Sequence, residues 1–238
     1  MQNFVFKVDG QKYECPMSAE GVVLEQWIEL MDVQKNEMPE SLQAILDEED
    51  AGKKKELVDK ITEVEYSHRH IPYMAKIVSI MCGMDYDKVV GGQIKMHPKD
   101  IEMLYGNCLK TFDNFKVDEE FDGFEFKGVR YEMPKEHMEG STVIEFMEAS
   151  QLQEHHSKLA AGVWGALPFV IAVLAKPAGE VYDEANTLIR GEQFKQLDLG
   201  TALNVSFFLI RQKHILNQNS LFYMVAHRLK QLKQELAS

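Results

Sequence analysis

The chain has 238 residues, of which 45% are hydrophobic and 27% are charged, and its formal net charge at pH 7 is −12. This length and composition suit a folded protein with one large domain or two domains of ordinary size. The negative charge argues against nonspecific binding to nucleic acid, because contact with phosphates requires a basic surface. We expect no signal peptide and no membrane-spanning run. The cysteines Cys15, Cys82 and Cys108 are odd in number and far apart, which predicts reduced thiols rather than a disulfide framework.

The first predicted element is a β-hairpin over residues 4–16. Apolar side chains alternate along its first strand and therefore share one face. Asp9-Gly10 supplies the turn, since glycine accepts a positive φ angle. Further along, residues 36–59 carry blocks of charge, which predicts a solvent-exposed excursion from the fold.

Two helices are predicted in the remainder of the first half. One shows apolar residues at helical spacing and ends at Gly83, a residue that commonly stops helices. Its stripe consists of Ile71, Met74, Val78 and Met81. The other begins near Pro98, which fits the first turn of a helix. Its apolar residues are Ile101, Leu104 and Cys108.

A second β-hairpin is predicted to begin at Phe124, which we align with Phe4 of the first hairpin. On this alignment its turn, at Lys127-Gly128, is two residues shorter than the first turn. The acidic stretch that precedes it marks the boundary between the two halves.

The end of the chain is predicted to be helical. Residues 199–210 are apolar almost all round, which indicates a helix in the core. The last predicted helix follows Ser220, a suitable N-cap, and carries a seam of three- and four-residue steps. The seam consists of Leu221, Val225, Leu229, Leu232 and Leu236. It either binds a partner helix or closes the second domain, and the second alternative is favoured. The candidate partner-binding residues are Leu229, Leu232 and Leu236.

Motifs of the first half recur in the second. Pro72 and Pro168 each stand before an aromatic residue, and Tyr86 and Tyr182 each stand before Asp. The two pairs have the same separation along the chain, which is difficult to obtain by chance and indicates an internal duplication. Scaffolds repeated in this way favour a binding or assembly role.

The predicted fold class is mostly α (α+β), with two similar tandem domains. Each domain would hold a β-hairpin followed by a small helical bundle. The domains are placed at residues 1–118 and 122–238, with the charged insertion near 36–59 in the first. Phe6 and Phe126 are expected to be buried where each hairpin packs on its helices.

The sequence shows no recognisable catalytic, phosphate-binding or metal-binding motif. The run at residues 52–55 lacks the flanking residues of a phosphate-binding loop. His68 and His70, and the pair His155 and His156, lack cysteine or histidine partners at metal-site spacing, so hydrogen-bonded or surface histidines are favoured. We therefore predict no catalytic, cofactor-binding or metal-binding residues and expect that the protein is not an enzyme.

These motifs together resemble a known family. The hairpin pattern F-x-F-x-G-x-x-Y-x-x-P is followed by a helix, then by a Pro-Tyr or Pro-Phe pair that opens an apolar helix, and then by Tyr-Asp. This order is similar to that of the tail assembly chaperones of tailed bacteriophages, although the tandem arrangement departs from the family pattern. The segments that carry the resemblance are Tyr73–Gly92, His97–Gly106, Leu167–Glu184, Arg190, Phe194 and Phe207–Leu209.

The resemblance implies a small, mostly helical protein of the host cytoplasm that works without a cofactor. Such proteins coat the tape-measure protein, recruit tail-tube subunits and leave before the tail is complete. The implied partners are the tape-measure and tail-tube proteins, with no nucleic acid and no membrane. Two alternatives stay open. One is a structural or packaged virion protein built from the same module, and the other is a small phage enzyme or an inhibitor of host defence.

Overall fold

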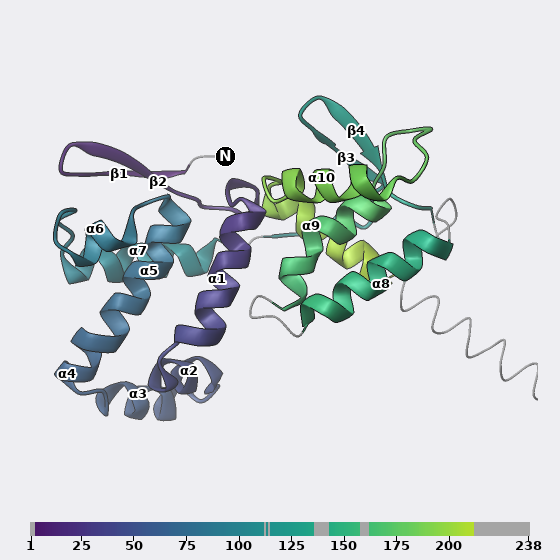
Figure 1. The fold of residues 1–238 in the computed structure, drawn as a ribbon. Helices are drawn as coiled ribbons and strands as arrows, with labels where there is room; N and C mark the ends of the chain where they lie inside the picture. Colours follow the sequence, from purple (N-terminus) through teal and green to yellow (C-terminus); the bar gives the residue numbers. More distant parts are fainter. Residues whose placement is uncertain (1–2, 112, 114, 136–142, 158–161, 212–238) are drawn as a thin grey trace, which may run out of the picture.

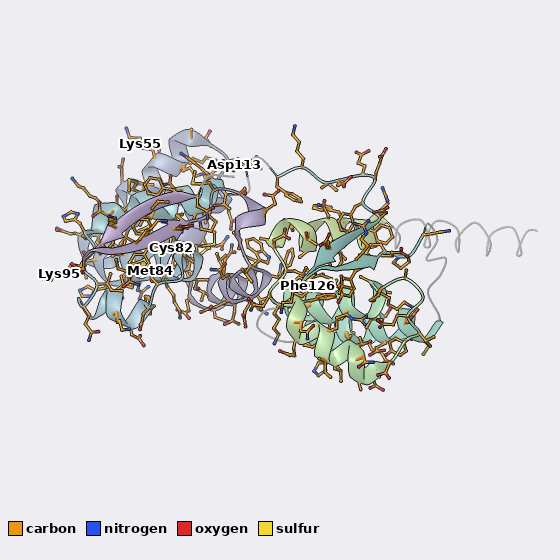
Figure 2. The ribbon with its side chains drawn as sticks, turned by 90° about the horizontal axis from the view of Figure 1, so that it is seen from above. Lys55, Cys82, Met84, Lys95, Asp113 and Phe126 are labelled. Carbon is orange, nitrogen blue, oxygen red and sulfur yellow. The ribbon has the colours of Figure 1, made fainter. Side chains whose placement is uncertain are left out.

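The computed structural model describes every residue except 1–2, 112, 114, 136–142, 158–161 and 212–238. The described chain is mostly helical and contains two small antiparallel sheets of two strands each. Two groups of elements lie on either side of the long helix α1 (Leu24–Glu37) (Figure 1), and they lie side by side when viewed from above (Figure 2).

The first group holds one hairpin and most of the helices. Its elements are β1 (Phe4–Val8), β2 (Gln11–Cys15), the short turn Ala19–Gly21, α2 (Glu40–Asp47), α3 (Ala51–Asp59), α4 (Glu63–Glu65), the π-helical turn η2 (Tyr66–His70), α5 (Ile71–Cys82), α6 (Tyr86–Val90) and α7 (Pro98–Lys110). The second group consists of β3 (Gly123–Phe126), β4 (Val129–Glu132), α8 (Val143–Ser157), α9 (Val163–Leu174), α10 (Glu184–Phe194) and a helix whose described part covers residues 199–211.

Both hairpins close on turns of two residues. The φ angles are 50° at Asp9 and 81° at Gly10 in the first turn, and 51° at Lys127 and 77° at Gly128 in the second. Two successive positive φ angles define the type I′ turn, which matches the twist of the flanking strands. The turns have equal length, so the prediction of a shorter second turn is wrong.

The error lies in the alignment of the strands. Phe6 pairs with Tyr13 and Phe124 pairs with Tyr131, and the rings of each pair stack with centroids 5.8 and 5.4 Å apart. Phe124 therefore corresponds to Phe6 and not to Phe4. By letter alone, Phe4 and Phe6 match Phe124 and Phe126 equally well. The cross-strand partners and the turns, however, match only when Phe6 is aligned with Phe124.

The hairpin aromatics are buried to different degrees. Phe124 is only 5% exposed, whereas Phe6 and Phe126 are half-buried. The expectation that Phe6 and Phe126 are both buried is therefore wrong in degree. Phe126 pairs with Val129 directly beside the turn, at the end of its strand. Phe124 lies two residues further from the turn and packs more completely.

The helical segments α4, η2 and α5 follow one another without interruption. In η2 the backbone N–H of Ile71 donates to the carbonyl of Tyr66, five residues back. The next residue is Pro72, which has no N–H to donate and whose ring crowds the preceding turn. A local π turn relieves this crowding, and such turns are frequent beside functional positions. At the other end Gly83, with φ 63°, ends α5 as predicted.

The charged segment at residues 36–59 is helical. It forms the end of α1 together with α2 and α3, and neither α2 nor α3 contains a buried residue. Asp50 caps α3 by accepting a hydrogen bond from the backbone N–H of Lys53 at 2.9 Å. The lysine run therefore begins an ordinary capped helix rather than a phosphate-binding loop.

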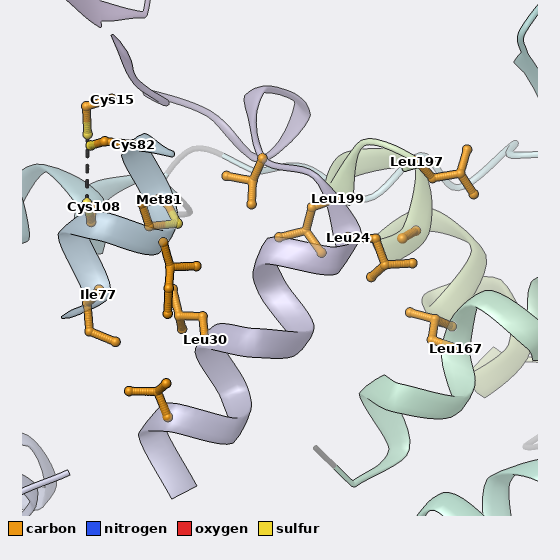
Figure 3. Close-up of a cluster of buried hydrophobic side chains, with 14 of the residues drawn as sticks. Cys15, Leu24, Leu30, Ile77, Met81, Cys82, Cys108, Leu167, Leu197 and Leu199 are labelled. Carbon is orange, nitrogen blue, oxygen red and sulfur yellow. Dashed lines mark hydrogen bonds between the residues drawn. The ribbon is translucent and has the colours of Figure 1, made fainter. Parts of the chain in front are cut away.

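The start of α1 joins the two groups. The backbone N–H of Leu24 donates to the carbonyl of Leu197 at 2.8 Å, and that of Leu199 donates to the carbonyl of Val22 at 2.7 Å. The side chains of Leu24, Leu197 and Leu199 are buried at this joint (Figure 3). Below them Trp27 of α1 meets Trp164 of α9 edge to face, with ring centroids 5.5 Å apart. One buried apolar cluster therefore runs through both groups.

Candidate functional site

The candidate partner-binding residues Leu229, Leu232 and Leu236 lie outside the described residues, so their role stays a prediction. The described helix at residues 199–211 leads directly toward them along the chain. The surface of this helix is therefore the described part of the chain that is examined for a partner-binding site.

This helix has one buried face and one open edge. Ala202, Val205 and Phe208 are 0%, 0% and 7% exposed, and they pack in the core. Phe207 is 42% exposed and Ile210 is 63% exposed. The prediction of a core helix is correct for the first face only. Phe207 and Ile210 are three residues apart and so lie on the same side of the helix. We call these two side chains the open edge.

Polar contacts hold the helix in this orientation. Asp198 is its N-cap, because its carboxylate accepts hydrogen bonds from the backbone N–H and the hydroxyl of Thr201, both at 2.8 Å. The amide of Asn204 accepts from the backbone N–H of Asp118 at 2.9 Å, which ties the helix to the segment between the two groups. The open edge is therefore presented by a fixed helix, where burial of its remaining apolar surface by a partner is favourable.

A second arrangement of chemical interest lies where α2 meets η2. The hydroxyl of Ser41 donates to Oε1 of Glu65 at 2.6 Å, and its oxygen lies 2.9 Å from Nε2 of His70. Because the single hydroxyl proton is directed at Glu65, Nε2 of His70 must carry a proton and donate to Ser41. His70 is therefore not placed to take a proton from Ser41, and the three residues form a hydrogen-bonded chain rather than a nucleophile with its base.

His70 is buried and its charged form is disfavoured. Burial lowers the pKa of His70, and the nearby carboxylate of Glu65 opposes this shift only in part. Its imidazole ring also lies against Tyr66, with ring centroids 6.0 Å apart. Of the two histidines considered in this segment, His68 is exposed to solvent and His70 is a hydrogen-bonded histidine of the interior.

The lowered pKa of His70 predicts that acid destabilises the fold. Between the unfolded value near 6.5 and the lower folded value, the unfolded chain binds a proton that the folded chain does not. The contribution of neutral His70 to the free energy of unfolding should therefore be complete above about pH 6.5. The free energy of unfolding should fall as the pH decreases below that value. Urea titrations at several pH values measure this slope.

A matched pair of variants isolates the contribution of His70. His70→Gln keeps a side-chain donor but cannot titrate, so the decline in stability between neutral and mildly acidic pH should become shallower. His68→Gln, two residues away and exposed, should leave the decline unchanged. If both variants keep the full decline, another group controls the acid response.

The three cysteines converge in space. Cys15 ends β2, Cys82 ends α5 and Cys108 lies in the last turn of α7, and all three are free and buried (Figure 3). The sulfurs of Cys15 and Cys108 are 3.8 Å apart. Donation of its thiol proton to Cys15 and Cys82, together with burial, raises the pKa of Cys108. The hydrogen bond with Cys108 lowers the pKa of Cys15. The neutral thiol of Cys108 packs as a small apolar group and is a poor nucleophile. Their separation in sequence gave no sign of this cluster.

Metal sites and membrane-spanning helices are two further features that the described ranges could contain. No group of three or more His, Cys, Asp or Glu side chains in this part of the chain is arranged to hold a metal ion. None of the described helices is both long enough and apolar enough to cross a membrane.

Comparisons of the chain with protein-family models, with curated proteins and with solved structures find no match. The function is therefore inferred from the chain's own sequence and geometry.

Proposed function

We propose that this protein is a non-enzymatic tail assembly chaperone of a tailed bacteriophage, acting in the host cytoplasm. It would bind and solubilise the tape-measure protein and help recruit tail-tube subunits. The proposal draws on the sequence resemblance and on one structural observation, the open edge formed by Phe207 and Ile210. This edge belongs to a helix whose other face is buried, and it precedes the leucine seam in the sequence.

The physical requirements of the role are simple. A tape-measure protein is a long amphipathic helical chain that aggregates when its apolar face meets water. A reversible chaperone needs exposed apolar side chains to cover that face, and it needs net charge to keep the complex soluble. The open edge supplies the first feature, and the net charge of −12 supplies the second.

We also propose that residues 1–118 and 122–238 are duplicated domains. Asp85 caps α6 by accepting from the backbone N–H of Lys88, and Asp183 caps α10 through Asn186, although the Tyr-Asp alignment places Asp183 opposite Asp87. Each hairpin is followed by a long helix, a helix that contains proline, an Asp-capped helix and a final helix. Helices α2 and α3 are additions to the first copy. The corrected hairpin alignment strengthens this correspondence.

Co-expression with the tape-measure protein of the same genome tests the proposed function. The chaperone should raise the soluble fraction of the tape-measure protein and co-purify with it. The complex should survive about 0.5 M salt, because screening weakens charge attraction but leaves apolar burial intact. Phe207→Ser with Ile210→Ser should abolish co-purification while leaving the unfolding transition in place, since both side chains are exposed.

A control for this variant lies on the far side of the molecule. Leu46 and Val58 are similarly exposed, at 42% and 48%, on α2 and α3. Leu46→Ser with Val58→Ser should leave co-purification unchanged. Equal loss in both double variants would remove the open edge as the site. Stoichiometric retention of the protein in purified virions would instead favour the structural or packaged virion protein.

A further inference from the structure

The second hairpin shows what kind of side chain fits beneath these sheets. Phe194 of α10 is completely buried there. Its ring centroid lies 5.5 Å from Phe124, 5.4 Å from Phe126 and 5.0 Å from Tyr131, and it meets all three rings nearly edge-on. Edge-to-face packing of this kind is the favoured geometry for aromatic groups. One phenyl ring therefore fills the space between the second hairpin and its helices.

The first hairpin has the same register but a different interior. A pocket of about 320 Å³ lies between β1 and α7. Its apolar lining consists of Phe6, Val8, Met96, Met103 and Leu104. Phe6 and Val8 correspond to Phe124 and Phe126, the two residues of β3 that Phe194 contacts in the second hairpin. The pocket thus borders the face of β1 that corresponds to the filled face of β3.

A short segment of the first half resembles the segment that carries Phe194. Residues 91–95 read Gly-Gly-Gln-Ile-Lys, and residues 191–195 read Gly-Glu-Gln-Phe-Lys. By this local match Ile94 lies opposite Phe194, at a separation of 194 − 94 = 100 residues that differs from the 96 of the proline and tyrosine pairs. An isoleucine is shorter than a phenylalanine and has no ring to insert. Ile94 is half-buried and packs against the core, and it is not among the residues that line the pocket.

The pocket is large enough for a ring and accessible from outside. An apolar cavity of about 150 Å³ suffices to bind benzene. Met103 at its wall is 51% exposed, and Lys95 at its rim lies at the outer end of the first group, away from the second group (Figure 2). Lys7 and Lys95 face Asp9 and Asp100 around the lining, so the charges of the rim balance. The pocket therefore combines an apolar lining from β1 and α7 with a rim of two positive and two negative side chains.

We propose that this pocket receives an aromatic side chain of a partner protein, in the way that Phe194 is received beneath the second hairpin. The proposal rests on the correspondence between the two hairpins and is independent of the tail-assembly role. The partner contributes an exposed phenylalanine-type anchor, and single buried aromatic anchors commonly dominate the energy of an interface.

The test uses the full chain and N-acetyl-4-fluorophenylalanine amide, observed by fluorine NMR during titration. The probe should bind saturably, unlabelled N-acetylphenylalanine amide should displace it, and N-acetylalanine amide should not. Val8→Trp fills the pocket and should weaken binding at least about tenfold. Val5→Trp is the matched control, because Val5 is 47% exposed and neighbouring side chains of a strand alternate between faces. Met103→Trp narrows the entrance without touching the hairpin and should also weaken binding.

Each other outcome overturns the proposal. Absence of saturable binding by the native chain does so directly, as does an equal loss in Val5→Trp and Val8→Trp when both variants unfold like the native chain. Binding that appears only after Phe222→Ser and Tyr223→Ser would show that the chain's own terminal segment occupies the pocket. A dimer that Val8→Trp dissociates would identify a second copy as the occupant.

Discussion

Replacing Phe194 with alanine is expected to lower the free energy of unfolding by about 3–5 kcal/mol, the range found when a buried phenylalanine is removed from a core. Phe194 is 0% exposed and is the central ring of the aromatic cluster beneath the second hairpin. Its removal leaves a cavity between α10 and the sheet. A two-stranded sheet has little stability of its own, so it depends on this contact.

Urea unfolding followed by circular dichroism measures this effect. Phe207→Ala on the next helix is the matched control, since it removes the same side chain from a site that is 42% exposed. The control should lower the free energy of unfolding by much less than Phe194→Ala, because a large part of its ring is already exposed to water. A loss below about 1 kcal/mol for Phe194→Ala would mean that the hairpin does not rest on this ring.

Much of the local structure could be predicted from the sequence, because local patterns determine it. The stripe that contains Met74 and Val78 repeats at helical spacing, and the structure confirms the helix and its end at Gly83. Asp9-Gly10 and Lys127-Gly128 identified both hairpin turns. The alignment of the two hairpins was harder to predict. Side chains on one face of a strand repeat every two residues, so the sequences match equally well when one strand is shifted by two residues.

Contacts between distant segments could not be predicted in this way. The joint of Leu24 with Leu197, and the meeting of Cys15 with Cys108, bring together residues far apart in the chain. No period or short motif encodes such pairs, since each partner reads only as an apolar residue of its own element. Which face of a helix stays exposed is equally difficult to predict from the sequence, because it depends on which other elements pack against the helix. Phe207 is an example.

The pocket under the first hairpin became recognisable only after the strands were aligned by structure. In the sequence, Ile94 and Phe194 are two apolar residues in similar surroundings.

Replacing Lys176 with methionine is expected to cost about 3–5 kcal/mol, the range for breaking a buried ion pair by removing one partner. The ammonium group of Lys176 pairs with the carboxylate of Glu145, and their side chains are 18% and 0% exposed. The backbone of Lys176 also exchanges hydrogen bonds with Glu132 of β4, at 2.9 and 3.2 Å. The residue therefore connects α8 to the second hairpin, and its loss removes the ammonium group that pairs with the buried carboxylate of Glu145.

The double variant Lys176→Met with Glu145→Leu separates charge from packing. Apolar residues of similar volume often replace a buried ion pair at little cost, so the double variant should recover most of the stability lost in Lys176→Met. Lys12→Met is the control, because Lys12 pairs with Glu14 at the surface, where the two side chains are 58% and 48% exposed and an ion pair contributes at most about 1 kcal/mol. Thermal and urea unfolding of the three variants measure these differences. If the double variant is as unstable as Lys176→Met, the loss comes from packing around Lys176 rather than from the broken ion pair with Glu145.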